Sequence, residues 1–447
     1  MTTLVTQRPA PDATPDWQFP AVERHHADGV QVVAAHLPAR PLLSVTVLVE
    51  AGANSDPVGQ EGIASLLGSA VLRGAGGRDE HALAVAFERV GAVPGVAVRF
   101  ERSEISLEVP GALLGEAMAL VADVLRNPAL ADDEVLRVRD SRIDRLRART
   151  TDTGFRAGRA AGRNLWAEDT RWAVGSAGSA DSLSTIEPSA VVDLHRRAWA
   201  TAPVAVVVTG DLRGVDVAAA CAPLAGGTGT AADVTVTPTT ALEGTRIHLV
   251  DVPGAVQSVL DVRTVGPAFG DADEPGLDVA ATALFGSFSS RLNLRLREEL
   301  GYTYGASGGF VRLRDGGWAR AGCSVRTEVT ADAVRELVEV LRTTVADGLD
   351  DAEVAQAREN LVRKFPVRYD GPGAVNGALV RRVHNDLSDD ERDQRLAALR
   401  DVDTARATAA LRDALGTDRL AITVAGAGDE VREDLAALSL GPVEDVD

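Results

Sequence analysis

The order of predicted strands and helices repeats once along the chain, and this repeat restricts the fold more than any other feature of the sequence. Three landmarks of the first half recur in the second: Gly62 with Gly276, Leu130 with Leu349, and Gly210 with Gly426. Their offsets of 214, 219 and 216 residues are nearly constant. A steady offset across separate landmarks indicates two copies of one domain.

The first half contains the clearest secondary-structure patterns. Residues 29–38 and 42–52 alternate apolar and polar side chains, which predicts two paired strands. Helical periodicity follows from Gly62, strands return between residues 95 and 110, and two long helical segments cover 111–150. In the second half, strands are predicted over 246–253, 258–266, 318–328 and 420–429, and helices over 276–301, 331–348 and 350–365. Asp315–Gly317 reads as a hairpin turn.

These patterns predict an α+β protein with two homologous domains, each an antiparallel-rich β-sheet packed with helices. Residues 1–20 are rich in Pro and Thr and are expected to form a disordered lead-in. The first domain is expected over 21–225 and the second over 246–440. Residues 226–245 join them, because this stretch is rich in Gly, Thr and Ala and poor in large apolar residues.

Charge and cysteine content exclude several classes of function. The 447-residue chain has 46 Lys and Arg against 65 Asp and Glu, a net charge of −19, and no Lys/Arg-rich run. Such a surface repels nucleic acid and anionic membranes. The longest uncharged stretch, 217–232, is too short to span a bilayer. Two cysteines and an N-terminus without a secretion signal are typical of a cytoplasmic protein.

Three segments then resemble a known family. Residues 62–76, 178–212 and above all SRLNLRLREELGYTYGASGGF at 290–310 are similar to the pitrilysin/insulinase (inverzincin) family of zinc peptidases, which includes the mitochondrial processing peptidase. The resemblance extends from about Val22 to Glu433. It implies that the two domains form half of a clamshell around an extended peptide.

The chain departs from this family at the zinc motif. Active members carry H-x-x-E-H on the first helix, where two histidines bind zinc and the glutamate polarises the bound water. In the same frame this chain has Ser65, Gly68 and Ser69, and serine hydroxyls are poor zinc ligands. The family's third ligand should fall near 141–148, where Asp144 is predicted to be a solvated surface residue. No metal site is therefore expected in this chain.

The active site of this family has two halves, the zinc motif of the first domain and an Arg/Tyr pair of the second, and this chain retains the second half-site. In active members the second domain supplies an Arg and a Tyr seven residues apart, which bind the substrate backbone and help to stabilise the transition state. Arg297 and Tyr304 have this spacing inside the matching motif. A guanidinium and a phenol can donate hydrogen bonds to peptide carbonyls and to an oxyanion. The alternative is structural: Arg297 pairs with Glu298 or Glu299, and Tyr304 caps a strand end.

One half-site without the other implies the non-zinc subunit of a heterodimeric zinc metallopeptidase, inactive alone, whose partner is a homologous H-x-x-E-H chain that carries the zinc. Its substrate would be a peptide, with leader peptides as one class by analogy. The alternatives are a non-proteolytic peptide-binding or structural assembly subunit, and a different catalytic chemistry for which the sequence offers no nucleophile or metal constellation. His81, His195, His248 and His384 are isolated and are predicted to be surface or packing positions.

Overall fold

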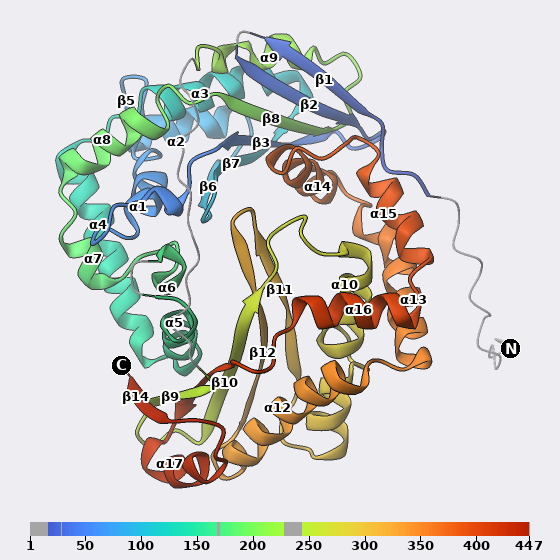
Figure 1. Ribbon diagram of the computed structural model, residues 1–447. Coiled ribbons are helices and arrows are strands. Elements are labelled where there is room, and N and C mark those ends of the chain that lie inside the picture. Colours follow the sequence, from blue (N-terminus) through green and yellow to red (C-terminus); the bar gives the residue numbers. More distant parts are fainter. Residues whose placement is uncertain (1–16, 28, 168–169, 228–243, 447) are drawn as a thin grey trace, which may run out of the picture.

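The computed structural model describes residues 17–27, 29–167, 170–227 and 244–446, and two six-stranded sheets organise them (Figure 1). The first sheet has the order β1-β2-β8-β3-β7-β6. Its strands are β1 (Val22–Ala27), β2 (Val30–His36), β3 (Leu42–Val49), β6 (Gly95–Val98), β7 (Ser103–Pro110) and β8 (Val204–Gly210). The short strands β4 (Gly74–Ala75) and β5 (Arg78–Asp79) form a separate hairpin.

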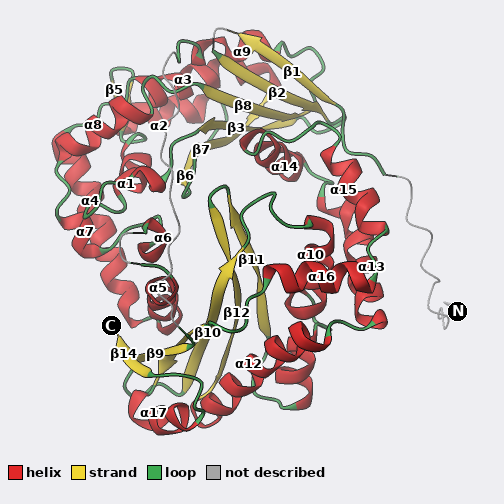
Figure 2. Cartoon of the chain, in the orientation of Figure 1, coloured by secondary structure: helices red, strands yellow, loops and turns green. Residues whose placement is uncertain are grey.

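The second sheet has the order β11-β12-β10-β13-β9-β14. Its strands are β9 (Arg246–Asp251), β10 (Gln257–Gly266), β11 (Ala306–Leu313), β12 (Gly316–Arg326), β13 (Ala421–Gly426) and β14 (Val443–Val446). β11 and β12 are joined by the predicted tight hairpin, since Leu313 pairs with Gly316. Helices cover both sheets and form most of the outer surface (Figure 2).

The helices of the first half are α1 (Ile63–Ala70), α2 (Glu80–Arg89), α3 (Leu114–Arg126), α4 (Asp132–Ala148), α5 (Thr153–Leu165), α6 (Arg171–Val174), α7 (Ala180–Ser184), α8 (Pro188–Ala198) and α9 (Val217–Cys221). Those of the second half are α10 (Glu274–Ala281), α11 (Arg291–Asn293), α12 (Thr330–Asp347), α13 (Asp351–Arg368), α14 (Pro372–His384), α15 (Glu391–Arg400), α16 (Thr404–Ala414) and α17 (Gly428–Ala437).

The two sheets confirm the predicted duplication. Five strands of each follow one order, β2-β8-β3-β7-β6 in the first and β9-β13-β10-β12-β11 in the second. The first pair of each set, β2–β8 or β9–β13, is parallel, whereas the other pairs in these five-strand sets are antiparallel. The sequence landmarks also lie at matching points, since Gly210 ends β8 and Gly426 ends β13. The protein therefore contains two copies of one α+β domain.

The prediction that residues 29–38 and 42–52 form paired strands is wrong in one respect. Both segments are strands, β2 and β3, but β8 lies between them and pairs with both. β8 follows β2 by some 170 residues in the chain, so local alternation of side chains carries no sign of this insertion.

The single helical segment predicted over 276–301 is also interrupted. The structure has α10, the π-helix η5 (Thr282–Gly286), α11 and a second π-helix η6 (Leu294–Glu299). The Asn293 amide explains the break, because its Nδ2 donates to the carbonyl oxygens of Ser287 (3.1 Å) and Ala306 (2.8 Å). These bonds hold the intervening turn against the start of β11. Helices α14, α15 and α16 were not predicted.

Two equivalent helices cross between the domains. α5 lies on the second sheet, where Asn164 Nδ2 donates to the Ile422 carbonyl of β13 at 2.9 Å. α14 lies on the first sheet, where Asn376 Nδ2 donates to the Val207 carbonyl of β8 at 3.0 Å. Each domain thus lends a helix to the sheet of the other, and an asparagine fixes each contact by satisfying a buried polar group. This exchange sets how the two domains face one another.

Aromatic contacts add to the domain interface. Trp166 and Trp172, which follow α5, pack against Trp318 of β12 with ring centroids 6.1 and 5.9 Å apart. Residues 17–20, the described end of the predicted lead-in, lie on the second domain, where Trp17 stacks on Tyr369 at 5.7 Å. These contacts bury apolar surface of residues that lie far apart in the sequence.

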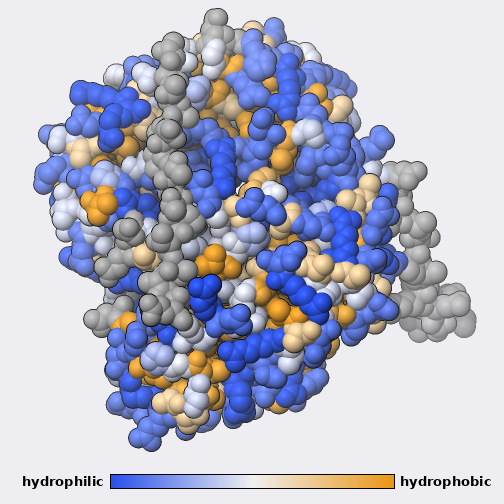
Figure 3. Space-filling view, viewed as in Figure 1, coloured by the Kyte–Doolittle hydropathy of each residue, from blue (hydrophilic) through white to orange (hydrophobic). Residues whose placement is uncertain are grey.

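No helix among the described residues is long and apolar enough to cross a bilayer. On the face drawn in Figure 3, hydrophobic residues form separate patches within a mainly hydrophilic surface.

Candidate functional site

Helix α1 carries the three positions of the altered zinc motif. Ser65 and Ser69 lie one turn apart on its half-exposed face, and Gly68 is buried between them. A Cβ atom on Gly68 would come within 2.8 Å of Val98 Cγ2 in strand β6. The strand therefore lies directly against the position where active relatives carry their glutamate.

Both serine hydroxyls are engaged within the protein. Ser65 Oγ donates to the Ser176 carbonyl at 2.6 Å, and Ser69 Oγ donates to the Ser65 carbonyl at 3.1 Å. Arg142 Nη1, from α4, donates to Ser69 Oγ at 2.9 Å. A guanidinium thus lies at the second histidine position, while Asp144 is exposed.

These residues do not fit zinc. Zinc requires imidazole, thiolate or carboxylate ligands, and the first helix offers two hydroxyls next to a fixed positive charge. Within the described residues there is no group of three or more His, Cys, Asp or Glu side chains that could hold a metal ion.

Asp56 fixes the start of α1. Its carboxylate, 3% exposed, accepts hydrogen bonds from the Gly62 nitrogen at 2.6 Å and the Ala64 nitrogen at 3.1 Å. Burial raises the pKa of Asp56 to about 7, although these two bonds oppose the shift. The sequence analysis missed this residue, because a carboxylate that caps a helix from six residues upstream has no local signature.

The raised pKa of Asp56 makes the stability of the protein depend on pH. The folded state retains a proton that the unfolded state releases above about pH 4, so stability should fall as the pH rises through 7. Relative to Asp56→Asn, the wild type should lose on the order of 3 kcal/mol between pH 5 and pH 8. Urea unfolding of both proteins across this range measures the difference, and parallel pH profiles would contradict the assignment.

The second-half motif lies on η6 and the loop before β11. Arg297 packs over the Phe288 ring with its Cζ 4.1 Å from the centroid, and its Nε lies 3.3 Å from Glu298 Oε1. The ion pair considered in the sequence analysis is thus present, at the surface. Tyr304 is 95% exposed and no hydrogen bond to its hydroxyl is found in the described part of the chain, so it does not cap a strand end.

The two half-sites belong to different domains. α1 packs against α4, α8 and β6 of the first domain, whereas η6 packs against α11 and α12 of the second. Among the described residues, no hydrogen bond or ion pair joins Ser65, Gly68 or Ser69 to Arg297 or Tyr304. Within one chain, therefore, the described structure does not bring the two half-sites into contact.

A cluster of charged residues, which was not predicted from the sequence, joins the two domains. His384, the last residue of α14, has 1% of its side chain exposed. Its Nδ1 lies 3.0 Å from Glu50 Oε1 and its Nε2 lies 3.2 Å from Glu101 Oε2. Arg314 Nη1 donates to Glu50 at 3.0 Å, and its backbone nitrogen donates to Glu101 at 2.7 Å. His384 was predicted to be a surface or packing position, and the structure shows a buried ion cluster.

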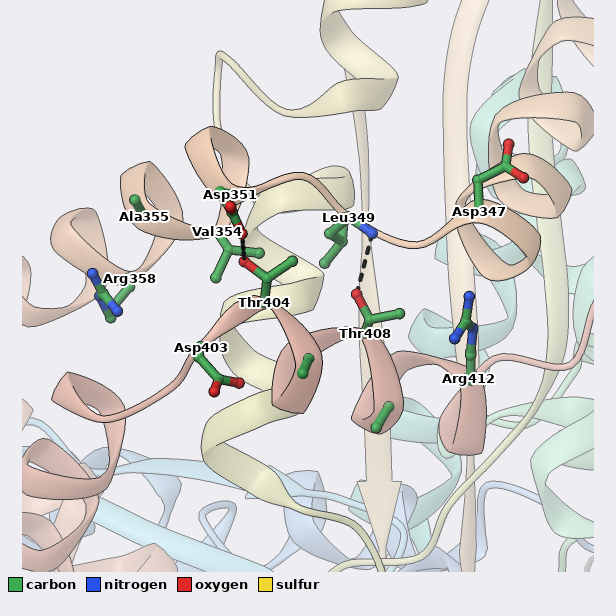
Figure 4. A pocket seen from close by; sticks show the side chains of 12 residues that line it. Asp347, Leu349, Asp351, Val354, Ala355, Arg358, Asp403, Thr404, Thr408 and Arg412 are labelled. Carbon is green, nitrogen blue, oxygen red and sulfur yellow. Dashed lines mark hydrogen bonds between the residues drawn. The ribbon is translucent and has the colours of Figure 1, made fainter.

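A cavity of about 860 Å³ opens between α16 and the turn from α12 to α13 (Figure 4). Its polar groups already pair with one another: Thr404 Oγ1 donates to Asp351 at 2.5 Å, and Thr408 Oγ1 accepts from the Leu349 nitrogen at 3.2 Å. The residues that line it include no histidine or cysteine. Of its three aspartates, Asp351 and Asp403 already accept hydrogen bonds, from the Thr404 hydroxyl and the Arg406 nitrogen.

Comparisons with known proteins agree with this geometry. The insulinase (peptidase family M16) domain matches residues 31–153, and the peptidase M16 inactive domain matches residues 190–361. An uncharacterized zinc protease of Mycobacterium tuberculosis is 28% identical over 340 residues, which cover 74% of this chain and 76% of that protein. One from Mycobacterium leprae is 26% identical over 340 residues, covering 74% of this chain and 75% of that protein.

Two solved structures share the fold. A peptidase M16 inactive domain from Pseudomonas fluorescens has a TM-score of 0.83 at 22% identity and covers 91% of this chain and 98% of its own. A protease from Helicobacter pylori has a TM-score of 0.81 at 17% identity, with 91% and 100% covered. Together with the two matching domains, these likenesses show that the chain belongs to the M16 (insulinase/pitrilysin) peptidase family.

Proposed function

We propose that this chain is the non-zinc subunit of a heterodimeric zinc metallopeptidase. The partner is a homologous chain with an intact H-x-x-E-H motif, which holds the zinc ion and the bound water. This chain contributes Arg297 and Tyr304, and its two domains form one half of a clamshell around the peptide. The substrate is an extended peptide that adds a strand to a sheet edge of the zinc-bearing subunit.

The exposure of Tyr304 carries this proposal. A tyrosine that is 95% exposed leaves about one aromatic ring of apolar surface in water, uncovered by the residues that the structure describes. Phe288, whose ring packs against the Arg297 guanidinium, is also 64% exposed. Exposed aromatic and arginine side chains of this kind are typical of contact surfaces.

The chemistry required of the two residues is modest. The Arg297 guanidinium can donate to a carbonyl of the bound peptide, and the Tyr304 hydroxyl can donate to the oxygen that gains negative charge as the peptide bond is attacked. Neither acts as a nucleophile or transfers a proton. Arg297 would exchange its exposed contact with Glu298 for the peptide, which is a small loss because surface ion pairs contribute little.

A second candidate function rests on the same ion pair. If Arg297 remains paired with Glu298 in the assembled protein, the chain is a non-proteolytic peptide-binding or structural subunit. The two candidates differ in whether the activity of the assembly depends on Arg297.

Purification of the chain tests the proposal. Alone, the protein should contain no stoichiometric zinc by elemental analysis and should cleave no peptide, because Ser65 and Ser69 provide no zinc ligands. Mixed with the H-x-x-E-H homologue, it should elute as a heterodimer in size-exclusion chromatography. Peptidase activity from this chain alone, abolished by a chelator, would contradict the proposal.

A further inference from the structure

Arg142 carries a positive charge that the described structure does not balance. Two other arginines of α4 are paired, since Arg137 contacts Glu134 and Arg139 contacts Asp140. Arg145 has no carboxylate partner among the described residues, but its side chain is exposed to solvent. For Arg142, no carboxylate oxygen of the described residues lies within 4.0 Å, and its only hydrogen bond is to the neutral Ser69 hydroxyl. Its Nε is buried without a partner. Burial, together with repulsion from Arg145, lowers the pKa of Arg142, as expected for an uncompensated cation.

The position of this charge relates it to a peptide-binding edge. Ser69 and Gly68 are consecutive in α1, so Arg142 contacts one residue while β6 lies against the other. Among the described residues, β6 pairs only with β7, and it forms one edge of the first sheet. An extended peptide added to this edge would run close to the guanidinium.

We propose that Arg142, together with Ser69, binds a carboxylate group of a peptide that lies along the edge of β6. A guanidinium recognises a carboxylate through paired N–H donors, and a partly desolvated charge gains more from such a bond than an exposed one. The inference rests on the proposed function, because it assumes that the chain handles peptides, and it adds to the sheet edge of the zinc-bearing subunit a second peptide contact on this chain. It extends that function by giving the altered zinc site a role of its own: a fixed positive charge replaces the metal and selects an acidic group.

The preference of Arg142 for an acidic group is opposite to the preference for neutral or basic peptides that the net charge of the whole protein implies. The net charge of −19 disfavours acidic peptides in general. A half-buried arginine without a carboxylate partner should therefore impose an acidic residue at one position of the peptide, while neutral or basic residues are preferred elsewhere.

Selection from random peptides tests the proposal. The immobilised full-length chain is exposed to two pools of randomised dodecapeptides, one with free C-termini and one with amidated C-termini, and the captured peptides are sequenced. We expect Asp and Glu to be enriched about tenfold or more at one position, in line with a hydrogen bond to a charged group. Enrichment in both pools identifies an acidic side chain as the ligand, whereas preferential capture of the free-acid pool identifies the C-terminal carboxylate.

Two variants complete the experiment. Arg142→Gln should abolish the acidic preference and should unfold at the same temperature as the wild type or higher, because it removes an unbalanced charge. Arg145→Gln, on the exposed side of the same helix, makes the same change of charge and should retain the preference. Captured peptides without an acidic preference, or a preference that survives in Arg142→Gln, would overturn this inference and leave the heterodimeric peptidase untouched. Failure to capture any peptide would overturn peptide binding by this chain, and the inference with it.

Discussion

Replacement of Arg297 by Ala should lower kcat/KM of the reconstituted heterodimer by about 10²-fold or more, which corresponds to about 3 kcal/mol of transition-state stabilisation. Arg297 is half-exposed and has no buried partner, so its loss should leave the fold intact. Tyr304→Phe removes only the phenol hydroxyl of a fully solvated side chain and should lower the rate in the same direction. Steady-state kinetics of the heterodimer measure both effects.

Two matched variants control for indirect effects. Arg295→Ala removes an arginine of the same π-helix that pairs with Glu299 and Glu336, and should leave kcat/KM nearly unchanged. Tyr302→Phe removes the hydroxyl of the other tyrosine in the motif, which packs against the core of the second domain. If Arg297→Ala and Tyr304→Phe retain full activity in an intact heterodimer, the two residues have no part in catalysis.

Replacement of His384 by Ala should destabilise the protein by about 3–5 kcal/mol, the usual effect of removing one partner from a buried ion cluster. Both ring nitrogens face carboxylates, so only the doubly protonated imidazolium can donate to Glu50 and Glu101 at once. Burial lowers the pKa of His384, but the hydrogen bonds that its ring donates to Glu101 and Glu50 outweigh burial and raise the pKa overall. Without the imidazolium, the two carboxylates of the first domain lose their buried partner from the second domain and keep Arg314 as their contact across the interface.

The destabilisation should depend on pH in a definite direction. A raised pKa in the folded state gives stability that is complete below the ordinary histidine pKa and is lost as the pH rises through the folded value. The difference between wild type and His384→Ala should therefore be largest near pH 6 and smaller at alkaline pH. His81→Ala, at an exposed position of α2, should change stability by less than about 0.5 kcal/mol. Urea unfolding measures the free energy of unfolding of the three proteins. Equal stability of all three at pH 6 would contradict a stabilising role for the ion cluster.

Much of the fold could be predicted from local patterns. Two of the three landmark pairs fall at equivalent points of the fold: Gly210 and Gly426 end equivalent strands, and Leu130 and Leu349 lie two residues before α4 and α13. The third pair matches less closely, since Gly62 precedes α1 and Gly276 lies inside α10. The order of strands within each sheet could not be predicted, because β8 enters between β2 and β3 from a distant part of the chain. The exchange of α5 and α14 was equally inaccessible. Asn164 and Asn376 contact the opposite domain, and nothing in a helix specifies which sheet it will cover.

In the candidate site, too, residues within a local motif could be predicted, and residues that depend on long-range contacts could not. Ser65, Gly68 and Ser69 could be identified because the surrounding motif sets their frame. Arg142 could not, since it is one of several arginines in α4, and only the fold shows that its side chain reaches Ser69. His384 was isolated in sequence, and its partners Glu50 and Glu101 come from the other domain. Residues that act through long-range contacts leave no pattern in the sequence.

The most direct measurement is a titration of the H-x-x-E-H homologue with this chain, with cleavage of a fluorogenic peptide as the readout. If this chain supplies the second half of the active site, activity should rise from a low level and reach a plateau at one equivalent. Zinc should be found only on the homologue. Full activity of the homologue without this chain, or no gain in activity once the heterodimer has formed, would contradict the assignment.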